Sequence, residues 1–372
     1  MFVEKSFKFL TDFNQHANEI QMINYIRKEI RQLKGYSLAS YPEAIKLNQN
    51  EIPYDVPGLI KAKVLEKLVL IPWNRYPLSQ AFSLKERLSQ ALNWPVEGIL
   101  VSNGSNVLIQ AIMLATSVGE QMLTLDPTFS LYEIEAKVLG NKVSLVRLRE
   151  DFSFPKEAFL KSMTNFPPSV IFLANPNAPT GNLFPKEDLL EVIKKARCLV
   201  VVDEAYCQFA DYNLLEELSN YKNLVLLRTF SKALGLGGVR IGFALAHPEI
   251  AQEISKLLLP YCVNSISEII AEAILEHPEV VEKNLAEIKR ERAVLYQSLS
   301  NIEGVQVYPS QTNFLVFQVK NGTDTFNALL KEGVLVRNVS HPSSLPNTLR
   351  VTVGTPEENQ IFVRVLRKIL SL

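Results

Sequence analysis

Seven short apolar runs, separated by turns and helical stretches, constrain the fold of this chain more than any other feature. Apolar runs of this length bounded by turn residues indicate buried strands. Their alternation with helices predicts an α/β fold with a mostly parallel, doubly wound, seven-stranded sheet. Because ligands bind at the carboxyl ends of the strands in such sheets, the residues after each run are the first candidates for a site. The runs are 99–102, 122–125, 143–146, 170–174, 199–202, 224–227 and 239–244.

A lysine, Lys232, follows the run 224–227 in a glycine-rich loop. Desolvation at a strand end destabilises the ammonium form, and a neutral amine is a nucleophile toward aldehydes. Arg240, later in the same loop, offers a fixed cation for a phosphate, and the glycines between them let the backbone approach a ligand. Taken alone, a Ser-Lys pair such as Ser231 and Lys232 is better interpreted as part of a surface loop. The arginine and the glycines favour a ligand site instead.

An aspartate, Asp203, ends the apolar run 199–202, and Tyr206 follows it. A carboxylate at that depth needs a cation or a protonated ring nitrogen as its partner, although a buried aspartate can also be purely structural. Together with Lys232 at a neighbouring strand end, a shared cofactor site is the more economical interpretation.

Two polar turns follow other strands. Residues 103–106 read NGSN before an apolar helix expected at 107–115, so Ser105 and Asn106 lie at a helix N-terminus. Such a terminus suits a phosphate and is equally consistent with an ordinary cap. The run 170–174 leads into NPNAPTG, which carries Asn175 and Asn177.

These strand ends together describe a ligand with a phosphate, an aldehyde and a ring nitrogen, and pyridoxal 5′-phosphate has all three. From about residue 36 to the C-terminus the chain resembles the fold-type-I aminotransferases, and within them the histidinol-phosphate aminotransferase family. The resemblance implies a large domain with the sheet described above and a small α+β domain. It is carried, in this order, by NGSN, PTFSLY, NPNAPTG, DEAY, RTFSKALGLGGVR, PSQTNFLVF and LRVTVGTPEEN.

The resemblance also implies cofactor contacts. Lys232 would bind the cofactor aldehyde and then carry a proton as general base and acid. Asp203 would pair with the pyridinium nitrogen, Tyr206 would hydrogen-bond the phenolic oxygen O3′, and Phe129 would stack on the ring. Tyr76 would reach the cofactor phosphate of a neighbouring subunit, so the active species would be a homodimer. The phosphate would be cradled by Ser105, Asn106, Ser231 and Arg240.

One position departs from the family pattern. Family members commonly read NPNNPTG, and the second of the paired asparagines donates to O3′, whereas this chain has Ala178 there. Either Asn175 or Asn177 substitutes for the missing amide, or Tyr206 holds O3′ unaided. The sequence leaves these alternatives open.

The resemblance implies a substrate site with two anion-binding arginines. Arg350 would bind the substrate α-carboxylate, and Arg337, with Tyr36, the substrate phosphate. The leading function is amino transfer between L-histidinol phosphate and 2-oxoglutarate, giving imidazole-acetol phosphate and L-glutamate, a step of histidine biosynthesis. An aromatic aminotransferase or a threonine-phosphate decarboxylase is the alternative. A non-catalytic regulatory member of the fold is disfavoured because Lys232 is present.

Composition bounds the remaining expectations. Lys plus Arg and Asp plus Glu each number 39, so no nucleic-acid or acidic-membrane partner is indicated. The widely spaced cysteines fit a reducing, cytoplasmic setting, and the scattered histidines indicate no metal site. No apolar run is long enough to span a membrane.

The expected domain organisation has five parts. They are a helical extension at 1–34, an arm with a substrate loop at 35–75, a large cofactor-binding domain at 76–263, a connecting helix at 264–300 and a small domain at 301–372.

Overall fold

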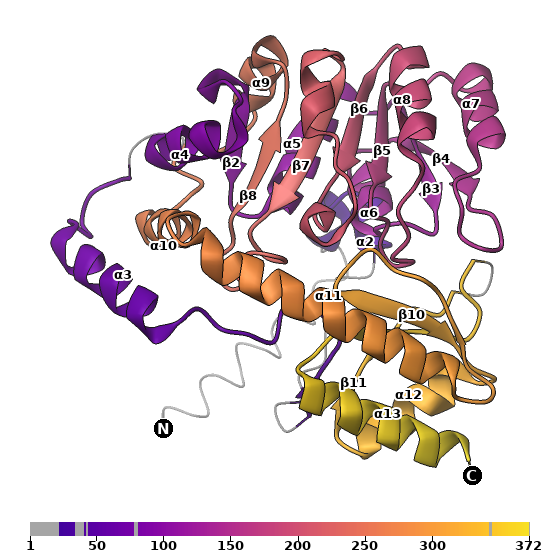
Figure 1. Cartoon of the computed structure of the whole chain (residues 1–372). Coiled ribbons are helices and arrows are strands. Elements are labelled where there is room, and N and C mark those ends of the chain that lie inside the picture. The colour runs from indigo at the N-terminus through magenta and orange to yellow at the C-terminus, as the bar shows by residue number, and fades with distance from the viewer. Residues whose placement is uncertain (1–21, 34–40, 42–43, 78–80, 342–343, 372) are drawn as a thin grey trace, which may run out of the picture. The chain divides into compact units, whose positions relative to one another are not determined.

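The computed structural model describes residues 22–33, 41, 44–77, 81–341 and 344–371 (Figure 1). The chain divides into two compact units, Met1–Ser40 and Tyr41–Leu372. The described part of the first unit holds a 3-10 turn, η2 (Met22–Tyr25), and one helical turn, α2 (Lys28–Arg31). The continuous helix expected over 1–34 is therefore wrong for residues 22–33, because Arg27 has an extended ψ of 137° that separates the two turns.

The large sheet of the described residues has seven strands in the order β2-β8-β7-β6-β5-β3-β4, which confirms the predicted architecture. All neighbours are parallel except β8, which runs antiparallel to β2 and β7. The strand expected at 239–244 begins later, because residues 237–239 form a turn. The strands are β2 (Ile99–Ser102), β3 (Gln121–Asp126), β4 (Lys142–Arg147), β5 (Val170–Ala174), β6 (Leu199–Asp203), β7 (Leu224–Thr229) and β8 (Gly242–Leu245).

Both faces of this sheet are covered by helices, as apolar side chains on both sides of the central strands require. In β5, Val170 and Phe172 enter one hydrophobic cluster while Ile171 and Leu173 enter the other. The first cluster is closed by α5 (Ser105–Thr116), α6 (Leu131–Val138) and α9 (Pro248–Ser255). The second includes side chains of α4 (Phe82–Leu92), α7 (Lys156–Asn165) and α8 (Lys186–Lys195). Each fully buried Leu, Ile, Val or Phe contributes about 1.5–3 kcal/mol, so the strand ends are firmly positioned.

A second, smaller sheet lies beyond the helical connector. Helices α10 (Ser265–Leu275) and α11 (Pro278–Ser300) meet at the break expected near His277 and Pro278. In Figure 1, α11 runs from the large sheet to α12 (Gly322–Lys331) and α13 (Pro356–Leu370). The predicted limits of the domains stay predictions. The described strands of the small sheet are antiparallel, in the order β12 (Arg337–Asn338), β13 (Thr348–Thr352), β10 (Phe314–Gln318) and β9 (Gln306–Val307).

The arm contains more regular structure than the sequence predicts. Strand β1 (Ile45–Lys46) pairs in parallel with β11 (Val334–Leu335), and α3 (Gly58–Leu70) follows. The sequence interpretation missed α3 because its apolar residues do not form one face: Ile60 and Val64 are buried, whereas several others are exposed. Between β1 and α3, the segment Leu47–Asn50 is largely buried. It contacts Tyr206 and Lys232, which follow strands of the large sheet, and Arg350 on the small sheet.

Candidate active site

Lys232 lies just beyond the end of β7, as predicted. Its Nζ donates a hydrogen bond to the carbonyl oxygen of Gln49 (2.8 Å) and lies 5.8 Å from the ring centroid of Tyr206. Burial lowers the pKa of Lys232 to about 7, and the positive charges of Arg350 and Arg240 act in the same direction. The amine is therefore substantially neutral, and so nucleophilic, near neutral pH.

This shift predicts the pH dependence of cofactor uptake. With a pKa of about 7, the neutral fraction of Lys232 rises from about one tenth at pH 6 to about nine tenths at pH 8. Covalent incorporation of pyridoxal phosphate into the apoprotein should accelerate roughly tenfold over that range. Stopped-flow absorbance measures this rate, and a rate that falls with rising pH would contradict the shift. Lys232→Ala, which should show no covalent phase, is the control.

Asp203 ends β6 and is buried. Its Oδ2 accepts a hydrogen bond from the Tyr132 hydroxyl (2.8 Å), and its Oδ1 accepts one from the backbone N–H of Ala205 (3.0 Å). Burial raises the pKa of Asp203 to about 6, although both hydrogen bonds act to lower it. A protonated ring nitrogen beside this carboxylate would offset the cost of its burial.

Tyr132 was missed by the sequence interpretation. It is fully buried on α6, and its ring packs edge-on against Phe129 (centroids 5.5 Å apart). The signal that could have found it was the spacing in PTFSLY, because an aromatic residue three positions after Phe129 faces the same way on a helical turn.

Tyr132→Phe should destabilise the apoprotein more at pH 8 than at pH 5. Asp203 has a folded-state pKa of about 6, above its value of 3.8 when unfolded. Its protonation therefore stabilises the fold at low pH, and this stabilisation is lost as the pH rises through 6. Above that pH the variant loses a hydrogen bond from Tyr132 to a charged Asp203 carboxylate, which is worth about 1.5–3 kcal/mol. Below that pH it loses a hydrogen bond to the neutral carboxyl group, which is worth about 1 kcal/mol. Urea unfolding at the two pH values measures the difference. Equal losses at both values would contradict it.

The N-terminus of α5 and the guanidinium of Arg240 come together. A Cβ placed on Gly104 would lie 2.5 Å from Nη2 of Arg240, and one on Gly242 would lie 2.1 Å from the backbone nitrogen of Ser105. Arg240 Nη1 also donates to the Ser231 hydroxyl (3.2 Å). A guanidinium, a hydroxyl and free helix N–H groups in one place form a suitable phosphate cradle.

The remaining predicted cofactor residues lie as follows. Asn106 is exposed in the first turn of α5, and Phe129 is partly buried two residues before α6. Tyr76 is exposed and stacks on Tyr261 (centroids 4.7 Å apart). Tyr36 lies outside the described residues.

The amides of Asn175 and Asn177 hold the surrounding turns. Asn175 donates to the Tyr212 hydroxyl (3.1 Å) and accepts from the backbone N–H of Phe184 (2.9 Å). Asn177 uses both its nitrogen and its oxygen. Its partners are the Pro127 carbonyl (3.0 Å), Thr180 Oγ1 (2.7 Å) and Thr128 Oγ1 (2.9 Å).

The two predicted substrate arginines lie opposite each other on adjacent strands of the small sheet. Arg337 on β12 pairs directly with Arg350 on β13, so their side chains leave the same face. Arg350 Nη2 donates to the carbonyl oxygen of Asn48 (3.0 Å), beside the carbonyl that Lys232 contacts. Arg337 forms no ion pair with any residue that the structure describes. Like charges directly opposite each other are destabilising, which favours an anion between or beside them.

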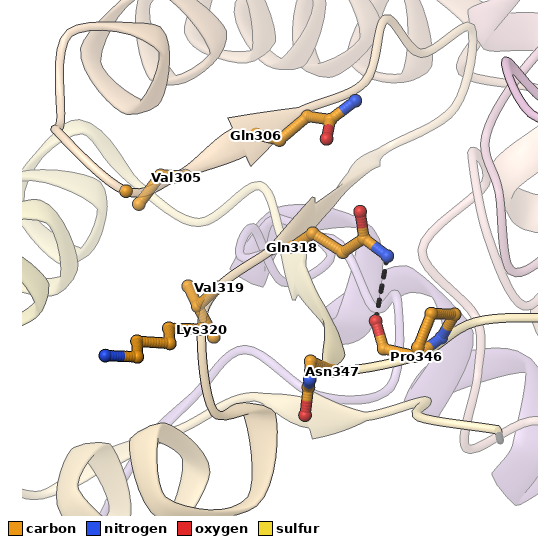
Figure 2. Close-up of a pocket in the computed structure, with 8 residues that line it drawn as sticks. Val305, Gln306, Gln318, Val319, Lys320, Pro346 and Asn347 are labelled. Atoms are coloured by element: carbon orange, nitrogen blue, oxygen red, sulfur yellow. Dashed lines mark hydrogen bonds between the residues drawn. The ribbon is translucent and has the colours of Figure 1, made fainter.

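The described residues also form a hollow that lies apart from the predicted site. A hollow of about 460 Å³ in the small domain is lined by residues such as Gln306, Gln318 and Lys320 (Figure 2). It contains none of the predicted site residues, and Gln318 there donates to the Pro346 carbonyl (2.8 Å). In the part of the chain that the structure covers, no cluster of His, Cys, Asp or Glu could hold a metal ion, and no helix is long and apolar enough to cross a membrane.

Known proteins share this sequence pattern and fold. Residues 42–366 match the family model of class I and II aminotransferases. Histidinol-phosphate aminotransferase 2 of Nitrosococcus oceani is 40% identical over 353 residues, covering 93% of this chain and 98% of the relative. The solved histidinol-phosphate aminotransferase of Clostridium acetobutylicum is 25% identical with a TM-score of 0.81, covering 87% of this chain and 98% of its own. The L-threonine-O-3-phosphate decarboxylase of Porphyromonas gingivalis is also 25% identical, with a TM-score of 0.78 and 88% and 99% coverage.

The fold and the strand-end lysine define an enzyme that uses pyridoxal 5′-phosphate. The chain belongs to the class I and II aminotransferase family. The residues present fit this cofactor, since the close approaches at Gly104 and Gly242 leave backbone and guanidinium donors where side chains would otherwise be. The charges of Arg240 and Asp203 both act on the pKa of Lys232, so each of these two groups lies within electrostatic reach of the lysine amine.

Proposed function

We propose that this enzyme transfers the amino group of L-histidinol phosphate to 2-oxoglutarate, forming imidazole-acetol phosphate and L-glutamate. The observation that carries this proposal is the direct pairing of Arg337 with Arg350 beside Lys232. A substrate with a phosphate and a co-substrate with two carboxylates both require cationic partners at a site of this kind. Relatives that carry the histidinol-phosphate name match the chain over nearly its whole length.

The chain's own residues have distinct tasks. When bound, pyridoxal phosphate supplies an electron sink that allows a proton to leave the substrate Cα. Lys232 would hold the cofactor through its amine and would then serve as general base and acid for that proton. Asp203 would keep the ring nitrogen protonated, and Tyr206 would donate to O3′. Phe129 would stack on the ring, while Arg240, Ser231, Ser105 and Asn106 would hold the phosphate.

The substrate arginines divide the anions between them. Arg350 binds the carboxylate of glutamate by a two-pronged contact, while one of its N–H groups donates to the Asn48 carbonyl. Arg337, which is partly buried and has no ionic partner among the described residues, binds the phosphate of histidinol phosphate. Both substrates therefore react at one lysine with different arginines engaged.

The direct test is an assay of purified enzyme with histidinol phosphate and 2-oxoglutarate, measuring glutamate. Efficient glutamate formation supports the proposal. Faster reaction with phenylalanine than with histidinol phosphate would instead identify an aromatic aminotransferase. Release of carbon dioxide from threonine phosphate would identify a decarboxylase, whose solved relative has a similar fold.

The surface around Tyr76 supports a homodimer. Tyr76 is 81% exposed, and the preceding residues include several large exposed apolar side chains. A surface of this kind on a folded protein marks an interaction site. The exposed apolar residues are Leu59, Leu65, Val69, Leu70 and Trp73. We therefore place Tyr76 at the cofactor phosphate of the partner subunit.

The cellular location is a separate point. The free cysteines, Cys198, Cys207 and Cys262, favour a reducing, cytoplasmic location.

A mixed dimer of Tyr76→Phe and Lys232→Ala chains tests this arrangement. If Tyr76 crosses to the partner, one site has both defects and the other has neither, so activity should return to about half that of the wild-type dimer. Steady-state rates of a dimer purified with two different affinity tags measure it. If Tyr76 acts within its own chain, the mixed dimer will instead show half the rate of the Tyr76→Phe homodimer.

A further inference from the structure

Asn50 is fixed beside Tyr206 by three parts of the chain. It is 1% exposed, and its Nδ2 lies 2.8 Å from the Tyr206 hydroxyl oxygen. Its backbone N–H donates to Thr352 Oγ1 (3.0 Å), and its carbonyl oxygen accepts from Asn313 Nδ2 (2.9 Å). Its φ of 56° lies in the left-handed region, which asparagine tolerates better than most residues.

These contacts determine which way the Asn50 amide points. The Thr352 hydroxyl accepts from the Asn50 backbone, so its own proton is available for Asn50 Oδ1, 3.4 Å away. With Oδ1 toward Thr352, the amide nitrogen faces Tyr206 and must act as a donor. The Tyr206 oxygen therefore accepts from Asn50, and its own proton is directed elsewhere.

The amides in NPNAPTG are engaged by the turns around them. Asn177 uses its nitrogen and its oxygen in the turns around it, and Asn175 is held between Tyr212 and Phe184. Tyr206, in contrast, lies next to the cofactor lysine, with Nζ of Lys232 5.8 Å from its ring centroid.

We propose that Asn50 is a positioning residue that makes Tyr206 the hydrogen-bond donor to O3′ of the cofactor, in place of the asparagine missing at position 178. The inference rests on the cofactor assignment and deepens it. Donation from Asn50 occupies the acceptor side of the Tyr206 hydroxyl and polarises its O–H bond, which strengthens donation to O3′. Of the three alternatives that the sequence leaves open, this selects Tyr206, with help from a residue far away in the chain.

The test uses the pH at which the absorption spectrum of the bound cofactor changes, and it needs no substrate. A donor on O3′ weakens that oxygen's hold on the proton of the neighbouring lysine nitrogen, so it lowers this midpoint. Asn50→Gly removes the amide and suits the left-handed backbone, and it should raise the midpoint by roughly 0.5–1 pH unit. Asn50→Asp keeps the shape but accepts the Tyr206 proton, so it should also raise the midpoint.

Two backgrounds separate positioning from a general structural effect. In Tyr206→Phe, Asn50→Gly should produce almost no further shift, because the effect acts through the hydroxyl. In Ala178→Asn, the restored amide should lower the midpoint and offset the loss of Asn50. Equal shifts with and without the Tyr206 hydroxyl, or no shift in Asn50→Gly, would overturn the proposal. Wild-type protein that takes up no cofactor would overturn the cofactor assignment itself.

Discussion

Lys232→Ala should lower the rate of transamination at least ~10²-fold, because the variant loses the general base and acid of the proton transfer. The effect should lie in kcat rather than in cofactor phosphate binding, since Arg240, Ser231 and the N-terminus of α5 remain in place. Single-turnover absorbance changes with histidinol phosphate measure the rate, and equilibrium dialysis with pyridoxal phosphate measures the binding.

Lys256→Ala is the matched control, since this exposed lysine follows the last residue of α9, outside the glycine-rich loop, and pairs with the nearby Glu253 (2.6 Å). It should retain wild-type rates. A Lys232→Ala enzyme within tenfold of the wild-type rate would show that another group moves the proton.

Arg350→Ala and Arg337→Ala should damage different half-reactions. Losing a hydrogen bond to a charged group costs ~1.5–3 kcal/mol, roughly ten- to more than a hundred-fold in transition-state binding. Arg350→Ala should chiefly slow the reaction with glutamate, and Arg337→Ala should slow the reaction with histidinol phosphate more strongly. The absorbance change between the pyridoxal and pyridoxamine forms, followed in single turnovers, separates the two.

Lysine substitutions at the same positions are the controls, because Arg→Lys keeps the charge but loses the planar two-pronged contact. They should fall between wild type and alanine. If Arg337→Ala leaves the histidinol-phosphate half-reaction unchanged, the phosphate is bound elsewhere and the substrate proposal is wrong.

The strand-end residues were the part of the site that the sequence could predict. Lys232 and Asp203 each follow an apolar run, and an apolar run in an alternating α/β pattern leaves little choice about where its end lies. The position of Ser105 was predictable for the same reason, because it begins a helix directly after β2. The sheet order and the antiparallel direction of β8 could not be predicted, since they depend on pairing between distant segments.

Contacts that join distant parts of the chain were out of reach. Asn50 lies in a proline-containing arm that resembles a loop, and its pairing with Tyr206 spans 156 positions. The facing of Arg337 and Arg350 depends on the register of β12 with β13, and β12 is two residues long. Tyr132 was hidden because a buried aromatic residue on a helix usually belongs to the core.

Borohydride reduction followed by peptide mapping tests whether Lys232 holds the cofactor, because it makes the bond between the cofactor and its lysine permanent. One labelled peptide, containing Lys232, is expected, and the label should be lost in Lys232→Ala. A label on any other lysine, with Lys232 unmodified, would show that the cofactor is bound elsewhere.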